Sequence, residues 1–140
     1  MQAALKYLSG LVFVGIIVQV ALAGIGAFHT VHANDDGPLA KSKAGDWFSA
    51  HGIVGTILVL VSLVLLLVAL AARDAQWRKR GLIIFGLMVV QLLLAWLGGG
   101  VWVLGFLHPV NALVLFAYTG MVAAAEWRGT APHAAAAPAA

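Results

Sequence analysis

The sequence predicts an all-α membrane protein, a transmembrane four-helix bundle made of two similar pairs of helices. Two observations, on composition and on the length of the apolar runs, lead to this fold class. Hydrophobic residues make up 63% of the 140 residues and charged residues only 9%, whereas soluble domains average about 25% charged residues. The apolar residues fall into four runs, each long enough to cross a hydrocarbon core about 30 Å thick. Cysteine is absent, which excludes disulfides, thiolate zinc sites and cysteine-ligated iron–sulfur clusters.

Each apolar run is predicted to be a helix, because lipid offers no partner for an unpaired backbone N–H or C=O group. The expected spans are approximately 7–28, 47–72, 81–103 and 108–127. They form one domain, 1–128, followed by an Ala- and Pro-rich tail, 129–140, that is expected to be disordered. The expected connections are a polar loop at 29–46, a basic loop at 73–80 and a short link at 104–107.

The distribution of Lys and Arg predicts the orientation of the chain. If all four runs cross the membrane, one side holds most of the basic residues: Lys6, Arg73, Arg78, Lys79, Arg80 and Arg128. The positive-inside rule then places both termini in the cytoplasm, and we expect a multi-pass protein of the bacterial cytoplasmic membrane. This topology explains the net charge of +3, so nucleic acid is not an expected partner.

The two halves of the chain repeat one pattern. The first span carries QVALAG from Gln19, and the third carries QLLLAWLG from Gln91. The second span opens with HGIVG from His51, and the fourth opens with HPVNA from His108. Parallel repeats of this kind are related by an axis along the membrane normal, which would make the two histidines face each other near the outer surface. Pro109 agrees with a helix that begins at His108, because proline is tolerated in a first turn.

His51 and His108 are the principal candidate site residues. An ionisable residue inside a membrane span is a functional-site hypothesis in its own right. Two imidazoles facing each other in a helix bundle suit a heme iron, so both are predicted to be metal ligands of one heme b. The alternative is that they are interfacial histidines, hydrogen-bonded to the backbone or to lipid headgroups.

Four further residues are candidate cofactor-binding positions. Gln19 and Gln91 are expected either to form hydrogen bonds between helices or to contact the cofactor or a water near it. Gly52 and Gly55 are either ordinary small packing positions or positions that leave room for a flat macrocycle. No catalytic residue is predicted.

His29 and His32 end the first apolar run in the sequence FHTVH. We expect them to be loop residues. The alternatives are that they contact heme propionates, together with Lys41 and Lys43, or that they bind a second metal.

The layout of these motifs resembles one half of heme A synthase, a protein of two four-helix bundles, over about residues 7–127. The resemblance implies that His51 and His108 are heme ligands at the outer ends of the second and fourth helices. The motifs at 51–55 and 107–112 are also similar to those of small actinobacterial four-span proteins of unassigned function. The catalytic half of the synthase carries Glu and Arg where this chain has Phe48 and Gly52. The implied function is therefore heme binding rather than hydroxylation.

The sequence thus predicts a cytochrome b-like membrane protein for electron transfer or heme handling, since two imidazole ligands leave no open iron position for O₂. A membrane redox partner or a quinone would be its expected partner, and glycine-rich helix faces permit a homodimer. Two alternatives remain open: a heme-dependent membrane oxidoreductase linked to quinone or superoxide, and a heme-free interaction subunit of a larger membrane complex. Whether the protein is an enzyme also remains open.

Overall fold

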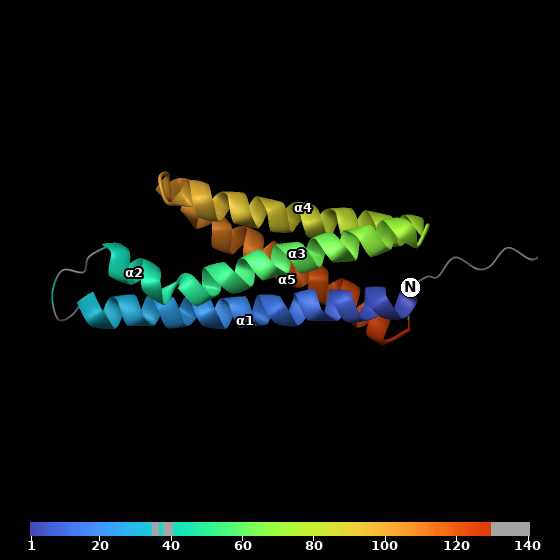
Figure 1. Cartoon of the computed structure of the whole chain (residues 1–140), viewed down its shortest axis with the longest axis horizontal. Coiled ribbons are helices and arrows are strands. Elements are labelled where there is room, and N and C mark those ends of the chain that lie inside the picture. Colours follow the sequence, from blue (N-terminus) through green and yellow to red (C-terminus); the bar gives the residue numbers. More distant parts are fainter. Residues whose placement is uncertain (35–36, 38–40, 130–140) are drawn as a thin grey trace, which may run out of the picture.

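Four long helices and one short helix make up the fold. The computed structural model describes residues 1–34, 37 and 41–129. Its helices are α1 (Gln2–Asn34), α2 (Lys41–Trp47), α3 (Ser49–Ala71), α4 (Ala75–Gly98) and α5 (Trp102–Trp127). The long helices form a ring in the order α1, α3, α4, α5, in which each packs against two antiparallel neighbours (Figure 1). All four are long and apolar enough to cross a membrane, so the predicted all-α four-span fold is confirmed.

A regular seam of buried residues holds the bundle together. On every long helix four buried residues follow one another at intervals of four, three and four residues, the spacing of the core positions of a helical bundle. The seam consists of Leu5, Ser9, Val12 and Ile16 of α1; Leu58, Ser62, Leu65 and Ala69 of α3; Trp77, Gly81, Ile84 and Met88 of α4; and Leu115, Thr119, Val122 and Glu126 of α5. The outward-facing residues are also mostly apolar, as expected for a surface in contact with lipid.

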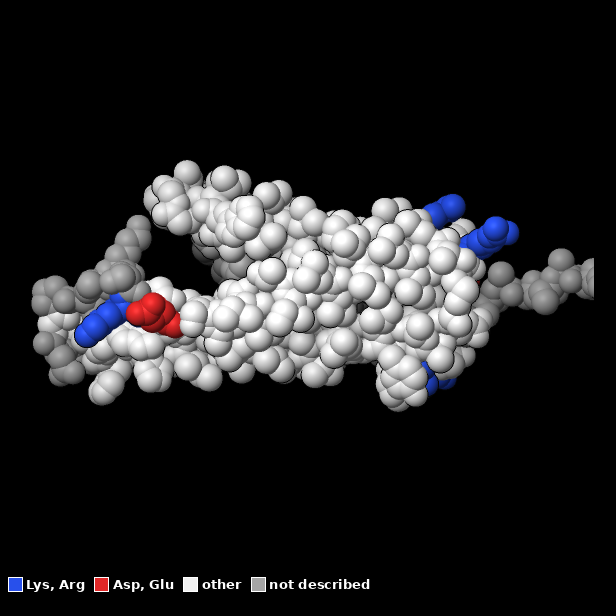
Figure 2. All heavy atoms as spheres, in the orientation of Figure 1, with Lys and Arg blue, Asp and Glu red and all other residues white. Residues whose placement is uncertain are grey.

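These buried seam residues all lie in one half of the bundle. We call this half the terminal end, because it holds the first residues of α1, the last residues of α5 and the α3–α4 turn. The opposite half, the histidine end, comprises residues 17–34, 43–57 and 89–114 among those described. Only Gly26 is buried there. Figure 2 shows a hollow at this end, between the α4–α5 turn and the region of α1 and α2.

The terminal end is closed by polar contacts. Arg73 takes a left-handed conformation with φ 57° and ends the α3 segment. The Asp74 carboxylate then caps α4 by accepting from the backbone N–H groups of Gln76 at 2.8 Å and Trp77 at 3.0 Å. Arg80 donates to the Glu126 carboxylate at 2.7 Å, which ties the start of α4 to the end of α5.

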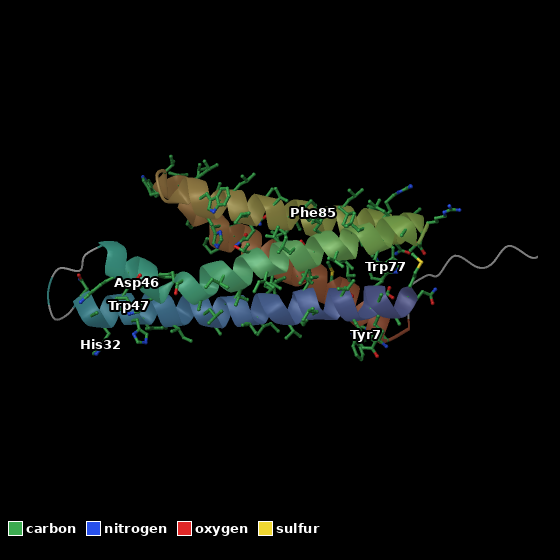
Figure 3. The ribbon with its side chains drawn as sticks, viewed as in Figure 1. Tyr7, His32, Asp46, Trp47, Trp77 and Phe85 are labelled. Carbon is green, nitrogen blue, oxygen red and sulfur yellow. The ribbon has the colours of Figure 1, made fainter. Side chains whose placement is uncertain are left out.

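The first helix is longer than predicted. We expected the first span to end near residue 28 and a polar loop to cover 29–46. Instead, α1 continues through Asn34 and residues 41–47 form α2, which packs against α1. At 33 residues, α1 is about 50 Å long, which exceeds a hydrocarbon core of about 30 Å. His32, Asp46 and Trp47 therefore gather beyond the bundle, far from Tyr7 and Trp77 (Figure 3).

The predicted link at 104–107 is wrong. The α4–α5 turn lies at 99–101, and α5 begins at Trp102. A Cβ atom on Gly98 would lie 2.5 Å from the Gly105 Cα atom, so the two backbones approach each other closely beside the turn, which requires glycine. His108 is consequently the seventh residue of α5, and Pro109 lies inside the helix rather than in its first turn. Residues 130–140 of the expected disordered tail lie outside the described part of the chain.

Candidate functional site

The seam continues into the histidine end but changes its chemistry there. After Ile16 of α1 the next positions at this spacing are Gln19 and Ala23, and after Met88 of α4 they are Gln91 and Ala95. Before Leu58 of α3 they are Gly55 and His51, and before Leu115 of α5 they are Ala112 and His108. Large apolar residues thus give way to small residues, two glutamines and two histidines, and Ala95 is exposed despite its seam position.

The two histidines face each other across the bundle. His51 comes from α3 and His108 from α5, helices that lie on a diagonal of the ring and do not pack directly together. Their ring centroids are 6.1 Å apart, with an angle of 66° between the ring planes. Both side chains are half-buried. The structure therefore brings together the two principal candidate residues, as the repeat predicted.

The same backbone contact orients each imidazole. The Nδ1 atom of His51 lies 3.1 Å from the main-chain oxygen of Gln19. The Nδ1 atom of His108 lies 3.0 Å from the main-chain oxygen of Gln91. A carbonyl oxygen accepts, so each Nδ1 carries a proton, and in the neutral form of each ring Nε2 keeps the lone pair. Metal-bound histidines commonly have this second contact, which selects the tautomer and the ring orientation.

Gln19 connects α1 to α3 beside His51. Its Nε2 atom donates to the main-chain oxygen of His51 at 3.0 Å. Its Oε1 atom is buried and has no hydrogen-bond partner among the described atoms. A Cβ atom on Gly55 would lie 2.6 Å from Gln19 Nε2, so glycine at position 55 lets the amide reach α3. Of the interpretations left open, the helix-to-helix hydrogen bond is therefore present for Gln19.

Gln91 is engaged more fully than its counterpart. Its Nε2 atom lies 3.0 Å from His108 Nε2, where it donates to the ring lone pair. Asn111 donates to Gln91 Oε1 at 2.7 Å and to the main-chain oxygen of Leu87 at 3.1 Å. Asn111 had no role in the sequence interpretation, although it lies three residues after His108 and so one turn further along the same face. The equivalent residue after His51 is Val54, which has no side-chain amide.

The remaining candidates, Gly52, His29 and His32, are exposed. Gly52 is exposed, and a Cβ atom there would meet nothing within 4 Å. His29 and His32 are exposed on the extension of α1, where the His29 ring lies 5.8 Å from the Trp47 ring. His29 is ten residues beyond Gln19, which corresponds to about 15 Å along the helix.

Of the two lysines predicted to contact heme propionates, Lys43 is exposed, and the side chain of Lys41 lies outside the described part. Within residues 1–34, 37 and 41–129, no group of three or more His, Cys, Asp or Glu side chains could hold a metal ion. Any metal between the two imidazoles would thus have His51 and His108 as its ionisable protein ligands.

No protein-family model, no curated protein and no solved structure matches this chain.

Proposed function

We propose that the chain is an integral membrane protein that binds one b-type heme between His51 and His108 and serves electron transfer or heme handling. The observation that carries the proposal is the separation of the two imidazoles. Two imidazoles that both point Nε2 at one metal from opposite sides would have ring centroids about 6.2 Å apart, because a metal–nitrogen bond is about 2.0 Å long and each nitrogen lies about 1.1 Å from its ring centroid. The observed separation is 6.1 Å.

The surroundings of the pair also fit a macrocycle. The seam positions beside the histidines are Ala23 and Ala95, and the histidine end contains no buried large apolar residue among those described. The unpartnered Gln19 Oε1 atom is a buried acceptor next to His51, which would suit a water or a polar group of a bound cofactor. A b-type heme bound there would supply one-electron chemistry at its iron.

One contact must change for the heme to bind. The Gln91 amide lies 3.0 Å from His108 Nε2, so this amide would have to turn away for that nitrogen to hold a heme. No contact of this kind is present at His51 Nε2 among the described residues. The two histidines are therefore unequal, because Gln91 engages His108 Nε2 and no side chain among the described residues engages His51 Nε2.

This inequality is the specific observation that favours a second candidate function. If the Gln91 amide keeps His108 Nε2 away from a heme, His51 would hold the heme alone, and the protein would be a heme-dependent membrane oxidoreductase linked to quinone or superoxide. Asn111 donates to Gln91 Oε1 and to the main-chain oxygen of Leu87, and these two hydrogen bonds hold the Gln91 amide in the position where it contacts His108. We favour binding by both histidines, because a bond from His108 to a metal would outweigh a neutral hydrogen bond, whose net contribution is about 1 kcal/mol.

The proposed orientation has both termini in the cytoplasm and the heme near the extracytoplasmic face. It is supported by the basic residues of the terminal end, where Figure 2 shows Lys and Arg without neighbouring exposed acidic side chains on the visible face. The resemblance to half of heme A synthase agrees with this arrangement of ligands and remains part of the proposal.

A visible spectrum of the purified protein tests the proposal. The protein is produced with added heme precursor, and the dithionite-reduced spectrum is compared with the oxidised one. We expect a sharp reduced α band and a pyridine hemochrome of heme b, at one heme per chain. A colourless protein that also fails to bind added hemin would reject heme binding and favour the heme-free interaction subunit.

A further inference from the structure

A second candidate site lies at the terminal end, away from the histidines. An open groove of about 590 Å³ runs between α1 and α5. Its walls include Tyr7, Gly10 and Val14 of α1 and Gly120, Ala124 and Trp127 of α5. From Tyr7 to Val14 the groove extends about 10 Å along the helix axis, roughly a third of the hydrocarbon thickness. It therefore opens toward lipid near one membrane face.

Small residues and aromatic rings shape this groove. A Cβ atom on Gly120 would lie 2.9 Å from the Phe13 ring, and one on Gly10 would lie 3.3 Å from Trp127 Nε1. The glycines thus allow aromatic rings to lie against the backbone of the facing helix. Phe13 in turn stacks on Phe116 with ring centroids 5.2 Å apart. The lining is apolar along its length and suits a linear hydrocarbon chain.

The end of the groove is positively charged. The Lys6 ammonium nitrogen lies 4.2 Å from the centroid of the Trp127 ring, and the Tyr7 ring meets the same indole edge-on at 5.9 Å. Arg128 follows Trp127 and is exposed. The helices that form the groove contribute no exposed carboxylate: α1 contains no acidic residue, and Glu126 of α5 is buried against Arg80.

We infer that this groove binds an anionic glycerophospholipid. One acyl chain lies between α1 and α5, and the headgroup phosphate lies at Lys6 and Arg128. The charge complementarity favours an anion over a neutral isoprenoid quinone, and Trp and Tyr are the residues that membrane proteins place at the headgroup level. Anionic headgroups are attracted to basic side chains at this depth. The inference does not depend on heme binding.

Native mass spectrometry of the full chain tests the inference. Delipidated protein in detergent is mixed with equal amounts of phosphatidylglycerol and phosphatidylcholine that have the same acyl chains. We expect one phosphatidylglycerol molecule to be retained in preference to phosphatidylcholine. The variant Lys6→Gln should reduce this preference about fivefold. The control Lys79→Gln removes an exposed charge of the terminal end from α4, outside the groove, and should leave the preference unchanged.

A second pair of variants tests the place of the acyl chain. Ala124→Leu adds bulk inside the groove and should lower retention of both lipids, whereas Ala117→Leu adds the same bulk to an exposed position on α5 outside it. Equal retention of the two lipids by the wild type, or equal losses in Lys6→Gln and Lys79→Gln, would overturn the inference. A co-purifying quinone displaced by Ala124→Leu, or a dimer that excludes lipid, would assign the groove to another occupant.

Discussion

Asn111 donates a hydrogen bond to Gln91 Oε1 at 2.7 Å. This contact makes the two halves of the bundle chemically different, although their seams follow the same spacing. In the second half the amide of Gln91 is anchored and reaches His108. In the first half Gln19 reaches only the main chain of His51, and its own oxygen has no partner among the described atoms. The two halves thus have a histidine at the equivalent position, whereas the polar side chains that support it differ.

Exchanging the supporting residues should reveal this difference in stability. Asn111→Val removes hydrogen bonds to Gln91 and Leu87, and the free energy of unfolding should fall by about 1–2 kcal/mol. Val54→Asn places an amide at the equivalent position, where it can donate to Gln19 Oε1 and offset the lost packing. Its effect on the free energy of unfolding should therefore be smaller. Equal losses in both variants, measured by denaturant unfolding in detergent, would contradict this explanation.

The proposed topology can be tested by labelling in intact cells. We expect a cysteine introduced by Ser42→Cys to react with a membrane-impermeant thiol reagent, because α2 extends from the histidine end. A cysteine introduced by Ala75→Cys, at the start of α4, should react only after the cells are permeabilised. The wild type is a suitable background because it contains no cysteine. The reverse pattern would put the histidine end in the cytoplasm.

Loss of either Arg80 or Glu126 alone should destabilise the fold more than loss of both. The two side chains are 12% and 4% exposed, and removing one partner of a buried pair costs about 3 kcal/mol. Arg80→Met should therefore destabilise the protein markedly, whereas the double variant Arg80→Met with Glu126→Leu should recover most of the loss. Arg78→Met, at an exposed position, is the control. Unfolding measurements that give the double variant the larger loss would show that the pair does not act as a unit.

The sequence predicted the number of membrane-spanning helices better than their ends or the faces by which they pack. Four apolar runs identify four spans, but on a helix in lipid the outer face is also apolar, so Leu60 and Leu65 look alike in sequence although only Leu65 is buried. The seam becomes visible only when the helices are packed. The histidine pair was predictable because imidazoles stand out within apolar runs.

Other features depend on contacts between distant segments. The extension of α1 through Asn34 involves packing with α2, and the residues there are too polar to be recognised as part of a membrane span. The pairing of Arg80 with Glu126 follows from the order of helices in the ring. The sequence did indicate that Glu126 needs a partner, because it is the one glutamate of the chain and lies in its last apolar run.

Substituting His51 or His108 should change the heme spectrum, and substituting the other described histidines should not. If the proposed function holds, His51→Ala and His108→Ala should each abolish the low-spin heme spectrum or make it high-spin. His29→Ala and His32→Ala should leave it low-spin, because both residues are exposed on the α1 extension. Electron paramagnetic resonance of the oxidised variants measures the spin state. A low-spin signal that survives in His108→Ala but is lost in His29→Ala would require a different ligand pair.

Carbon monoxide binding distinguishes electron transfer from oxygen chemistry. If His51 and His108 both hold the heme, the reduced protein should bind carbon monoxide slowly, because an imidazole carried by a packed helix would have to be displaced. The Gln91 side-chain amide, which donates to His108 Nε2 in this structure, would stabilise that released imidazole. Gln91→Leu should therefore bind carbon monoxide more slowly than the wild type, whereas Gln19→Leu should not share this effect, since Gln19 contacts the main chain of His51 rather than its Nε2. Flow mixing of the dithionite-reduced protein with carbon monoxide gives the rates. Rapid, stoichiometric binding by the wild type would instead favour the oxidoreductase, because an enzyme that activates oxygen keeps one iron position open or weakly held.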